Sequence, residues 1–250
     1  MRVRRFQGIA AAVLSWPIFL GSGFLCFLVL STIALIALPF DRSLGARLGG
    51  WVWGRVVYGA VPWWTLRLEG FEAVERGPFM IVSNHASVLD IPALMHLPMG
   101  FRVVAKRSLF RIPFLGWFMS LSGQIPWDPG LEGTTRERCL LELRAGRSVL
   151  MFPEGTRSAD GRVARFKRGA FQIAREAGVP VLLCAVDGPR HILPKGGLVP
   201  DFFFVTVNVE VLGVLEPTDF EDEREMALQA QKRVASRVAT WQGRQEEVQA

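Results

Sequence analysis

Two patterns of hydrophobic and polar residues divide this chain. Residues from Phe6 to Phe40 form an uncharged, largely apolar run, whereas from about Gly70 short apolar runs alternate with charged amphipathic stretches. A helix crosses a bilayer core with about 20 apolar residues, so the first run is too long for one untilted span. A break at Gly21-Ser22-Gly23 would give two short arms that dip into one leaflet. A single tilted span with an interfacial extension is the alternative.

The residues around this run indicate a membrane-associated segment. Arginines flank it on both sides, which by the positive-inside rule places both ends on the cytoplasmic face and favours the hairpin. A cleaved signal peptide is disfavoured, because its apolar region is only about 7–15 residues long. From Leu48 to Leu68, tryptophans mix with arginines as in an interfacial segment, although a partly buried helix of a soluble domain is the alternative. The flanking arginines are Arg2, Arg4, Arg5, Arg42 and Arg47, and the tryptophans are Trp51, Trp53, Trp63 and Trp64.

The rest of the chain predicts strands that alternate with helices. Short apolar runs indicate buried strands at 79–82, 101–105, 148–152 and 181–186, and alternation at 202–214 indicates a longer, half-exposed strand. Helical patterns with polar starts and glycine stops cover 134–146 and 167–177, and a charged amphipathic helix covers about 222–243. This order predicts an α/β fold with a largely parallel or mixed sheet flanked by helices.

The same patterns predict three regions. Residues 1–68 form a membrane-anchoring helical segment, as a hairpin or as a single span with an interfacial helix. Residues 69–220 form the α/β domain, and residues 221–250 form an amphipathic helix that packs on that domain.

Composition narrows the class of protein. Half of the 250 residues are hydrophobic and 21% are charged, which excludes a disordered chain, and the charged stretches in the middle exclude a polytopic transporter. The net charge of +6 suits a nucleic acid, an anionic membrane or a phosphorylated substrate. We expect no nucleic-acid partner, because no recognisable binding motif is present. The three widely spaced cysteines suit neither a zinc site nor a disulfide framework.

The first chemical signal follows the strand at 79–82. His85 and Asp90 are five residues apart, which on a regular helix separates them by about 140°. They can meet only if His85 lies in a turn before a helix that starts near Asp90, and Pro92 supports such a late start. A carboxylate bonded to one imidazole nitrogen fixes the tautomer and leaves the other nitrogen as a base. A histidine with a structural role is the alternative.

The second signal is the string Phe-Pro-Glu-Gly-Thr-Arg-Ser at 152–158. Gly155 permits a sharp turn with exposed amides, and the Arg157 guanidinium matches the geometry of a phosphate. Glu154 can orient that arginine or a loop amide. Lys106, which ends another strand, adds positive charge at the same sheet edge, and a turn with a solvated charge cluster is the alternative. Further basic residues follow at Arg162, Arg165, Lys167 and Arg168.

The order and spacing of these strings resemble the glycerolipid acyltransferase family, and within it the 1-acylglycerol-3-phosphate (lysophosphatidic acid) acyltransferases. The resemblance covers about residues 70 to 215, and the apolar amino-terminal segment is also typical. The strings are Asn84-His85 with Asp90, Lys106 with Pro113 and Gly116, residues 152–158, and Val179-Pro180-Val181.

The resemblance implies an acyltransferase catalytic domain that moves a fatty acyl chain to the sn-2 hydroxyl of lysophosphatidic acid in phospholipid biosynthesis. It implies that His85 and Asp90 are catalytic. It further implies no metal and no cofactor, with acyl-CoA or acyl-carrier protein as co-substrate. The implied location is the inner membrane with the domain facing the cytoplasm, and the implied partners are the lipid bilayer, the lysophospholipid and the acyl donor. The implied substrate-binding residues are Lys106, Glu154, Gly155, Thr156 and Arg157.

One position departs from the family pattern. The second block of the family ends in an Asp-Arg pair, whereas this chain has Asp128 followed by Pro129. Proline cannot bind a phosphate through its side chain or its backbone nitrogen. Arg157, Lys106 or Arg136 could compensate, and another lysolipid acceptor is the alternative.

Three other classes of protein remain as alternatives. A lipid or thioester hydrolase would use the same base on water, but Gly-x-Ser-x-Gly is absent. A metal-dependent phosphoesterase needs a denser ligand cluster than His85, His96 and His191 provide. A non-catalytic membrane-binding module would bind anionic vesicles without any role for His85.

Overall fold

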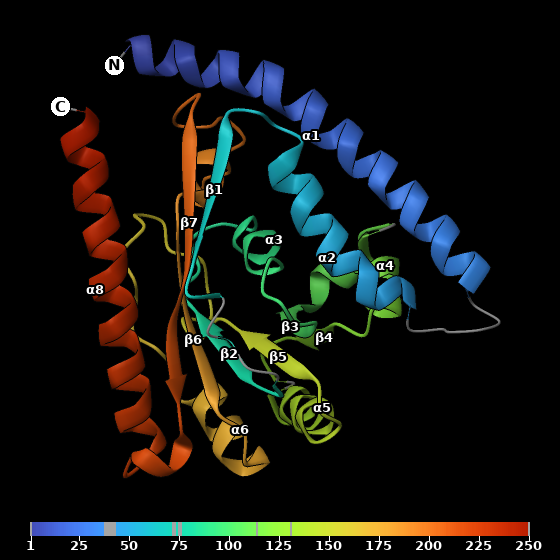
Figure 1. The fold of residues 1–250 in the computed structure, drawn as a ribbon, viewed down its shortest axis with the longest axis vertical. Helices are drawn as coiled ribbons and strands as arrows, with labels where there is room; N and C mark the ends of the chain where they lie inside the picture. The colour runs from blue at the N-terminus through green and yellow to red at the C-terminus, as the bar shows by residue number, and fades with distance from the viewer. Residues whose placement is uncertain are drawn as a thin grey trace.

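The computed structural model describes residues 2–37, 44–71, 74, 77–113, 115–130 and 132–249. Within them, seven strands form one sheet that helices cover on both faces (Figure 1). The strands are β1 (Trp64–Glu69), β2 (Met80–Ser83), β3 (Phe101–Lys106), β4 (Ile125–Trp127), β5 (Ser148–Met151), β6 (Val181–Asp187) and β7 (Val205–Leu215). The helices are α1 (Arg2–Ala37), α2 (Leu44–Gly59), α3 (Asp90–Leu94), α4 (Leu115–Leu121), α5 (Glu132–Arg144), α6 (Gly169–Ala177), α7 (Pro189–Ile192) and α8 (Glu223–Gln249), with 3₁₀ turns at Arg107–Arg111 and Pro217–Asp219.

The sheet order is β1-β7-β6-β2-β5-β3-β4. The five strands from β6 to β4 are parallel to one another, whereas β7 runs antiparallel to β6 and β1 runs parallel to β7. Strand β2 lies between β6 and β5 in the parallel part, with Met80 opposite both Val149 and Val181. The α/β fold with a mixed sheet flanked by helices is therefore confirmed.

Each face of the sheet has its own hydrophobic core. Helices α5, α6 and α8 pack on one face, where Leu143, Phe171 and Val234 are buried. Helices α2, α3 and α7 cover the other face, where Tyr58, Leu94 and Ile192 are buried. Figure 1 shows α8 on one side of β7 and α2 and α3 on the other. Apolar burial on both faces explains why the central strands are short, continuous hydrophobic runs.

The predicted break in the amino-terminal run is wrong, because α1 continues through Gly21-Ser22-Gly23. The Ser22 hydroxyl donates to the Phe19 carbonyl, so this serine is bonded within the helix. Gly23 faces Trp53 of α2, where an added Cβ would lie 3.4 Å from the indole ring. That distance is an ordinary van der Waals contact, and the two helices pack against each other here.

One face of α1 is docked on the domain. Ala11, Ser15 and Cys26 are buried. The Trp63 indole nitrogen donates to the Ser15 hydroxyl at 2.8 Å, and the Trp16 indole nitrogen donates to the Leu198 carbonyl at 2.6 Å. The opposite face exposes large apolar side chains, namely Ile9, Val13, Leu14, Ile18, Leu20, Phe24, Leu25, Leu28 and Val29.

The segment 48–68 divides between a helix and a strand. Helix α2 ends at Gly59, and β1 begins at Trp64 and pairs with β7. The boundary predicted between residues 68 and 69 therefore falls inside β1, and the sheet begins at Trp64. Trp64 is buried against Phe19 of α1 and so is a packing residue. The side chains of Arg2, Arg4, Arg5, Arg42 and Arg47, on which the orientation prediction depends, lie outside the part that the structure describes.

Candidate active site

The strand order brings the predicted site residues to one edge of the sheet. The carboxyl ends of β6, β2, β5 and β3 lie side by side, because these strands are parallel. His85 follows β2, residues 152–158 follow β5 and Lys106 ends β3. In open α/β sheets, ligands bind at this edge.

His85 and Asp90 form a hydrogen-bonded pair, as the spacing predicts. Helix α3 begins at Asp90, so His85 lies in the preceding turn. His85 Nδ1 lies 2.8 Å from Asp90 Oδ2, and the backbone amides of Ala86 and Ser87 donate to the same oxygen at 2.7 and 2.8 Å. Because a carboxylate only accepts, a neutral imidazole in this contact carries its proton on Nδ1 and keeps the Nε2 lone pair free.

The imidazole ring is held on one face and partly open to solvent. It stacks on the Phe152 ring with a centroid distance of 4.0 Å and an interplanar angle of 13°. The His85 side chain is 17% exposed, whereas the Asp90 side chain is only 2% exposed. A substrate can therefore reach the imidazole, while the carboxylate behind it is shielded.

Glu154 holds two loops together from within the protein. Its Oε1 accepts from the backbone amide of His85 at 2.7 Å, and its Oε2 accepts from the amide of Ala164 at 2.9 Å. The sequence left two roles open for Glu154, which were to orient Arg157 or to orient a loop amide. These hydrogen bonds correspond to the second role. Burial raises the pKa of the Glu154 carboxyl, and the two amide hydrogen bonds oppose that shift.

The loop at 152–158 is a tight turn flanked by basic side chains. Gly155 has a φ of +75°, which strains any other residue, and an added Cβ would lie 2.8 Å from Lys167 Nζ. The Ser158 amide donates to the His85 carbonyl at 2.7 Å, so the loop lies directly beside the histidine. Within the described residues, neither Arg157 nor Lys106 forms an ion pair with a carboxylate. Both cations are available to a ligand.

The departure at Pro129 lies at the same sheet edge. Strand β4 pairs with β3 so that Trp127 is opposite Lys106, and Asp128 and Pro129 follow directly. Arg136, considered as a compensating cation, instead forms an ion pair with Glu176 of α6. Lys106 and Arg157 remain as the predicted cations at this edge.

Several supporting residues carry no strong signal in the sequence. The Asn84 amide donates to the Val186 carbonyl and accepts from the Val186 amide, which joins β2 to β6 just before His85. The Tyr58 hydroxyl of α2 donates to the Leu89 carbonyl at 2.7 Å, and burial raises the pKa of that phenol well above its ordinary value. Both contacts join segments far apart in the chain. Only the adjacency of Asn84 to His85 could have suggested a role.

Among the described residues, no side chain that could act as a nucleophile is bonded to His85. No serine, threonine or cysteine hydroxyl or thiol among them bonds to His85, whose side chain bonds to Asp90. Cys139 and Cys184 are buried, and burial raises the pKa of each thiol to about 12. No group of three potential metal ligands occurs in the described part of the chain. The arrangement can therefore withdraw a proton from a hydroxyl that a substrate brings.

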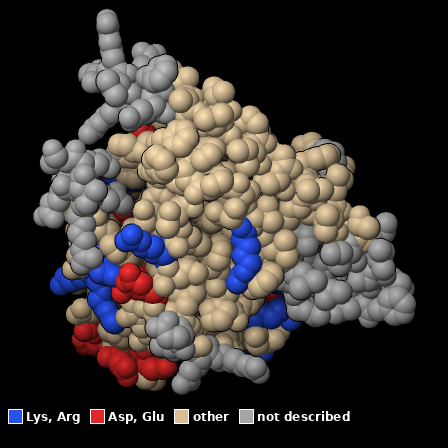
Figure 2. Space-filling view, turned by 45° about the horizontal axis from the view of Figure 1, so that its top comes forward, with Lys and Arg blue, Asp and Glu red and all other residues tan. Residues whose placement is uncertain are grey.

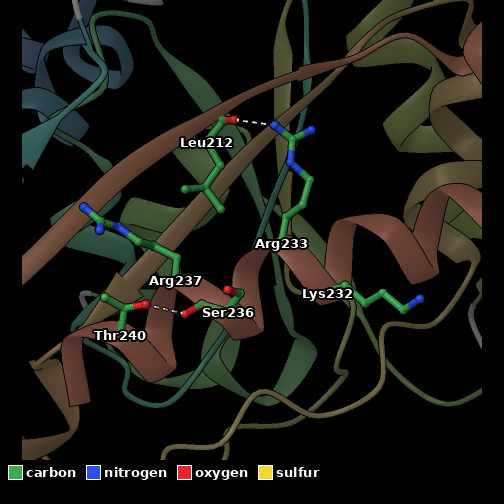
Figure 3. A pocket seen from close by; sticks show the side chains of 6 residues that line it. All are labelled: Leu212, Lys232, Arg233, Ser236, Arg237 and Thr240. Carbon is green, nitrogen blue, oxygen red and sulfur yellow. Dashed lines mark hydrogen bonds between the residues drawn. The ribbon is translucent and has the colours of Figure 1, made fainter. Parts of the chain in front are cut away.

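A hollow elsewhere on the surface belongs to the packing of α8. It lies between β7 and α8 (Figure 3), and Arg233 there donates to the Leu212 carbonyl at 2.8 Å. Arg237 forms ion pairs with Glu69 and Glu210. Both of these arginines are thus engaged in holding α8 to the sheet.

The chain is similar in sequence to known acyltransferases. Residues 65–187 match the acyltransferase family model. The chain is 41% identical over 140 residues to the chloroplastic 1-acyl-sn-glycerol-3-phosphate acyltransferase LPAT1 of Arabidopsis thaliana, which covers 54% of this chain and 39% of that protein. It is 40% identical over 140 residues to the chloroplastic 1-acyl-sn-glycerol-3-phosphate acyltransferase BAT2 of Brassica napus, which covers 54% of this chain and 41% of that protein.

A solved structure has the same fold. It is the crystal structure of PlsC, the 1-acyl-sn-glycerophosphate acyltransferase of Thermotoga maritima, which superposes with a TM-score of 0.73 at 24% identity. The superposition covers 92% of this chain and 98% of that chain. This chain spans about two fifths of the length of the two plant relatives. Residues 65–187, which contain His85, Asp90 and the loop at 152–158, are therefore a domain of the acyltransferase family.

Proposed function

We propose that this protein transfers a fatty acyl chain from a thioester to the sn-2 hydroxyl of lysophosphatidic acid, which gives phosphatidic acid. The observation that supports this most strongly is the 2.8 Å contact between His85 Nδ1 and Asp90 Oδ2 beside the basic loop at 152–158. The plant relatives are named for the same acceptor. The product would serve phospholipid synthesis.

The proposed reaction begins at the free nitrogen of His85. Nε2 takes the proton of the sn-2 hydroxyl as the oxygen attacks the thioester carbonyl carbon. The imidazolium that forms is stabilised by Asp90, which accepts the Nδ1 hydrogen bond throughout. When the tetrahedral intermediate collapses, the carbon–sulfur bond breaks and the leaving thiolate takes the proton from Nε2. His85 returns to its starting state, and the products are an ester and a free thiol.

The acceptor phosphate is assigned to the rim of the site. Arg157 and Lys106 supply positive charge, and Gly155 and Thr156 shape the turn that presents the loop amides. Glu154 acts on this site indirectly, since both of its oxygens are bonded to backbone amides. The donor is acyl-CoA or acyl-carrier protein. The proposal needs no metal and no cofactor beyond that donor, because a thioester is already activated.

We further propose that the protein works at a membrane, with the catalytic domain on the cytoplasmic face where such thioesters occur. Among the described residues, Gly8–Cys26 is long and apolar enough to cross a bilayer, by length and composition alone. The outward face of α1 is apolar, and the view with α1 turned toward the reader shows a broad surface with few charged side chains (Figure 2). The lipid substrate and product would remain in that bilayer.

The test is acyl transfer by the purified protein in detergent, with acyl-CoA and acyl-carrier protein as donors. The acceptors are lysophosphatidic acid, glycerol-3-phosphate and a zwitterionic lysolipid, and His85→Ala is the control. We expect phosphatidic acid from lysophosphatidic acid with the wild type and at most a trace with the variant. Product from the zwitterionic lysolipid alone would show that the acceptor is a different lysolipid, which is the alternative raised by Pro129. Free fatty acid without transfer would indicate a hydrolase, and no reaction with vesicle binding would indicate a non-catalytic module.

A further inference from the structure

A lysine outside the predicted site reaches the loop at 152–158. Lys195 lies in the segment between α7 and β7, and its side chain is exposed. Its Nζ lies 2.6 Å from the Arg157 carbonyl oxygen and 3.4 Å from Thr156 Oγ1. No other described side chain forms a hydrogen bond with the Arg157 carbonyl, so this ammonium group is a specific neighbour of the loop.

The contact lies close to the catalytic histidine along the backbone. The residue after Arg157 is Ser158, whose amide donates to the His85 carbonyl at 2.7 Å. On the other side, the Ser87 hydroxyl donates to the Leu193 carbonyl at 2.9 Å, two residues before Lys195. The segment that carries Lys195 is therefore fastened to the His85 turn, and its ammonium group reaches the next loop of the site.

Lys195 adds to the few cations at the carboxyl ends of the strands. Beyond Lys106, the edge ends at β4 with Asp128-Pro129-Gly130, which supplies no cation. Lys195 adds a cation from the opposite side, where β6 leads into α7. An ammonium group has three N–H donors. At most two of them are directed at the carbonyl and hydroxyl of the loop, so at least one is free for an oxyanion.

We propose that Lys195 is a phosphate-binding residue, which together with Arg157 holds the phosphate of the lysophosphatidic acid acceptor. This inference rests on the proposed function, because a phosphomonoester is the group that such a pair of cations would bind. The contact with Arg157 also positions the loop, so the two roles must be separated by experiment.

The test is the steady-state kinetics of three Lys195 variants with lysophosphatidic acid. Lys195→Gln keeps a hydrogen-bond donor for the Arg157 carbonyl but removes the charge, Lys195→Arg keeps the charge, and Lys195→Met removes both. We expect Lys195→Gln and Lys195→Met to raise the KM for lysophosphatidic acid about 5- to 10-fold, since a charged hydrogen bond is lost, with kcat within about twofold of the wild type. Lys195→Arg should stay near the wild-type KM.

A matched control makes the same chemical change far from the site. Lys232 on α8 lines the hollow of Figure 3. Lys232→Gln removes the same charge, and we expect it to leave the KM unchanged. An unchanged KM in Lys195→Gln would overturn the inference, and so would a fall in kcat shared by Lys195→Met and Lys195→Gln with KM constant, which indicates a purely structural contact. Absence of transfer to lysophosphatidic acid by the wild type would overturn the proposed function itself and this inference with it. The wild-type assay therefore distinguishes the two failures.

Discussion

The two halves of the site are built in opposite ways. Around His85, every group is fixed: Asp90 accepts three hydrogen bonds on one oxygen, and Glu154 accepts an amide on each of its oxygens. At the rim, Arg157 and Lys106 form no ion pair among the described residues. Proton transfer demands a defined geometry, whereas a phosphate can be held by charges that adjust to it. Substitutions in the first half should therefore change kcat, and substitutions in the second half should change KM.

The largest effect is expected at His85 itself. His85→Ala removes the proposed base, and general-base catalysis contributes about 10²–10⁴-fold to a rate. We expect kcat to fall by that factor while the protein stays folded, since the ring is partly exposed and its removal leaves Asp90 with two amide donors. Initial rates of phosphatidic acid formation measure it, with thermal unfolding as the control for folding. A variant that keeps full activity would contradict the account.

The next effect separates the charge of Asp90 from its hydrogen bonds. Asp90→Asn can place its amide oxygen where Oδ2 accepts three donors, so the turn is kept but the negative charge is lost. We expect kcat to fall about 10- to 100-fold, from the loss of about 1.5–3 kcal/mol of charge-assisted stabilisation.

Asp90→Ala serves as the partner variant. It also leaves the amides of Ala86 and Ser87 without their acceptor inside the protein, so it should lower the free energy of unfolding as well. Equal stability of the two variants would contradict this assignment, and it would be measured by denaturant unfolding.

Arg157→Ala tests the other half of the site, where Arg157 and Lys106 supply positive charge. We expect the KM for lysophosphatidic acid to rise about tenfold, since one charge-assisted contact to the phosphate is lost, with kcat within about threefold of the wild type. Arg162→Ala is the matched control, because Arg162 is an exposed arginine whose nearest acid is Asp160 at 3.9 Å. A fall in kcat with constant KM would place Arg157 in the chemistry instead.

The smallest effect on turnover is expected at Glu154. Glu154→Gln presents an NH₂ group to one of two amides that now bond to carboxylate oxygens, so we expect a loss of about 1–3 kcal/mol in the free energy of unfolding. Burial raises the pKa of Glu154, so folding favours its protonated form and wild-type stability falls as the pH rises through that raised pKa. Glu154→Gln has no carboxyl at this position and so lacks this pH-dependent part of the stability. The difference in free energy of unfolding between the wild type and Glu154→Gln should therefore narrow as the pH rises. A constant difference would contradict the assigned burial effect.

The sequence predicted the central part of the fold well, because its information is local. The runs at 79–82, 101–105, 148–152 and 181–186 coincide with β2, β3, β5 and β6 to within one residue. Buried parallel strands are continuous apolar runs, which can be recognised in the sequence itself. The turn at His85 was predictable for the same reason, since the spacing to Asp90 and the position of Pro92 restrict the start of the helix.

The parts that were missed depend on contacts between distant segments. Strand β1 contains Trp64 and Arg67, which look like an interfacial segment, and it becomes a strand only by pairing with β7 some 140 residues later. Strand β4 is three residues long and contains Pro126, which an edge strand tolerates. The stacking of Phe152 on His85, the bonds of Asn84 to β6 and the reach of Lys195 to Arg157 likewise need coordinates.

The claim that joins these observations is that the acceptor's own hydroxyl is the nucleophile. It is tested most directly by mixing the enzyme with a labelled acyl donor in the absence of acceptor, then adding lysophosphatidic acid. We predict no acylated protein and no burst of free thiol before the addition, and labelled phosphatidic acid with one thiol per turnover after it. A stoichiometric burst of thiol with label covalently attached to the protein would contradict it.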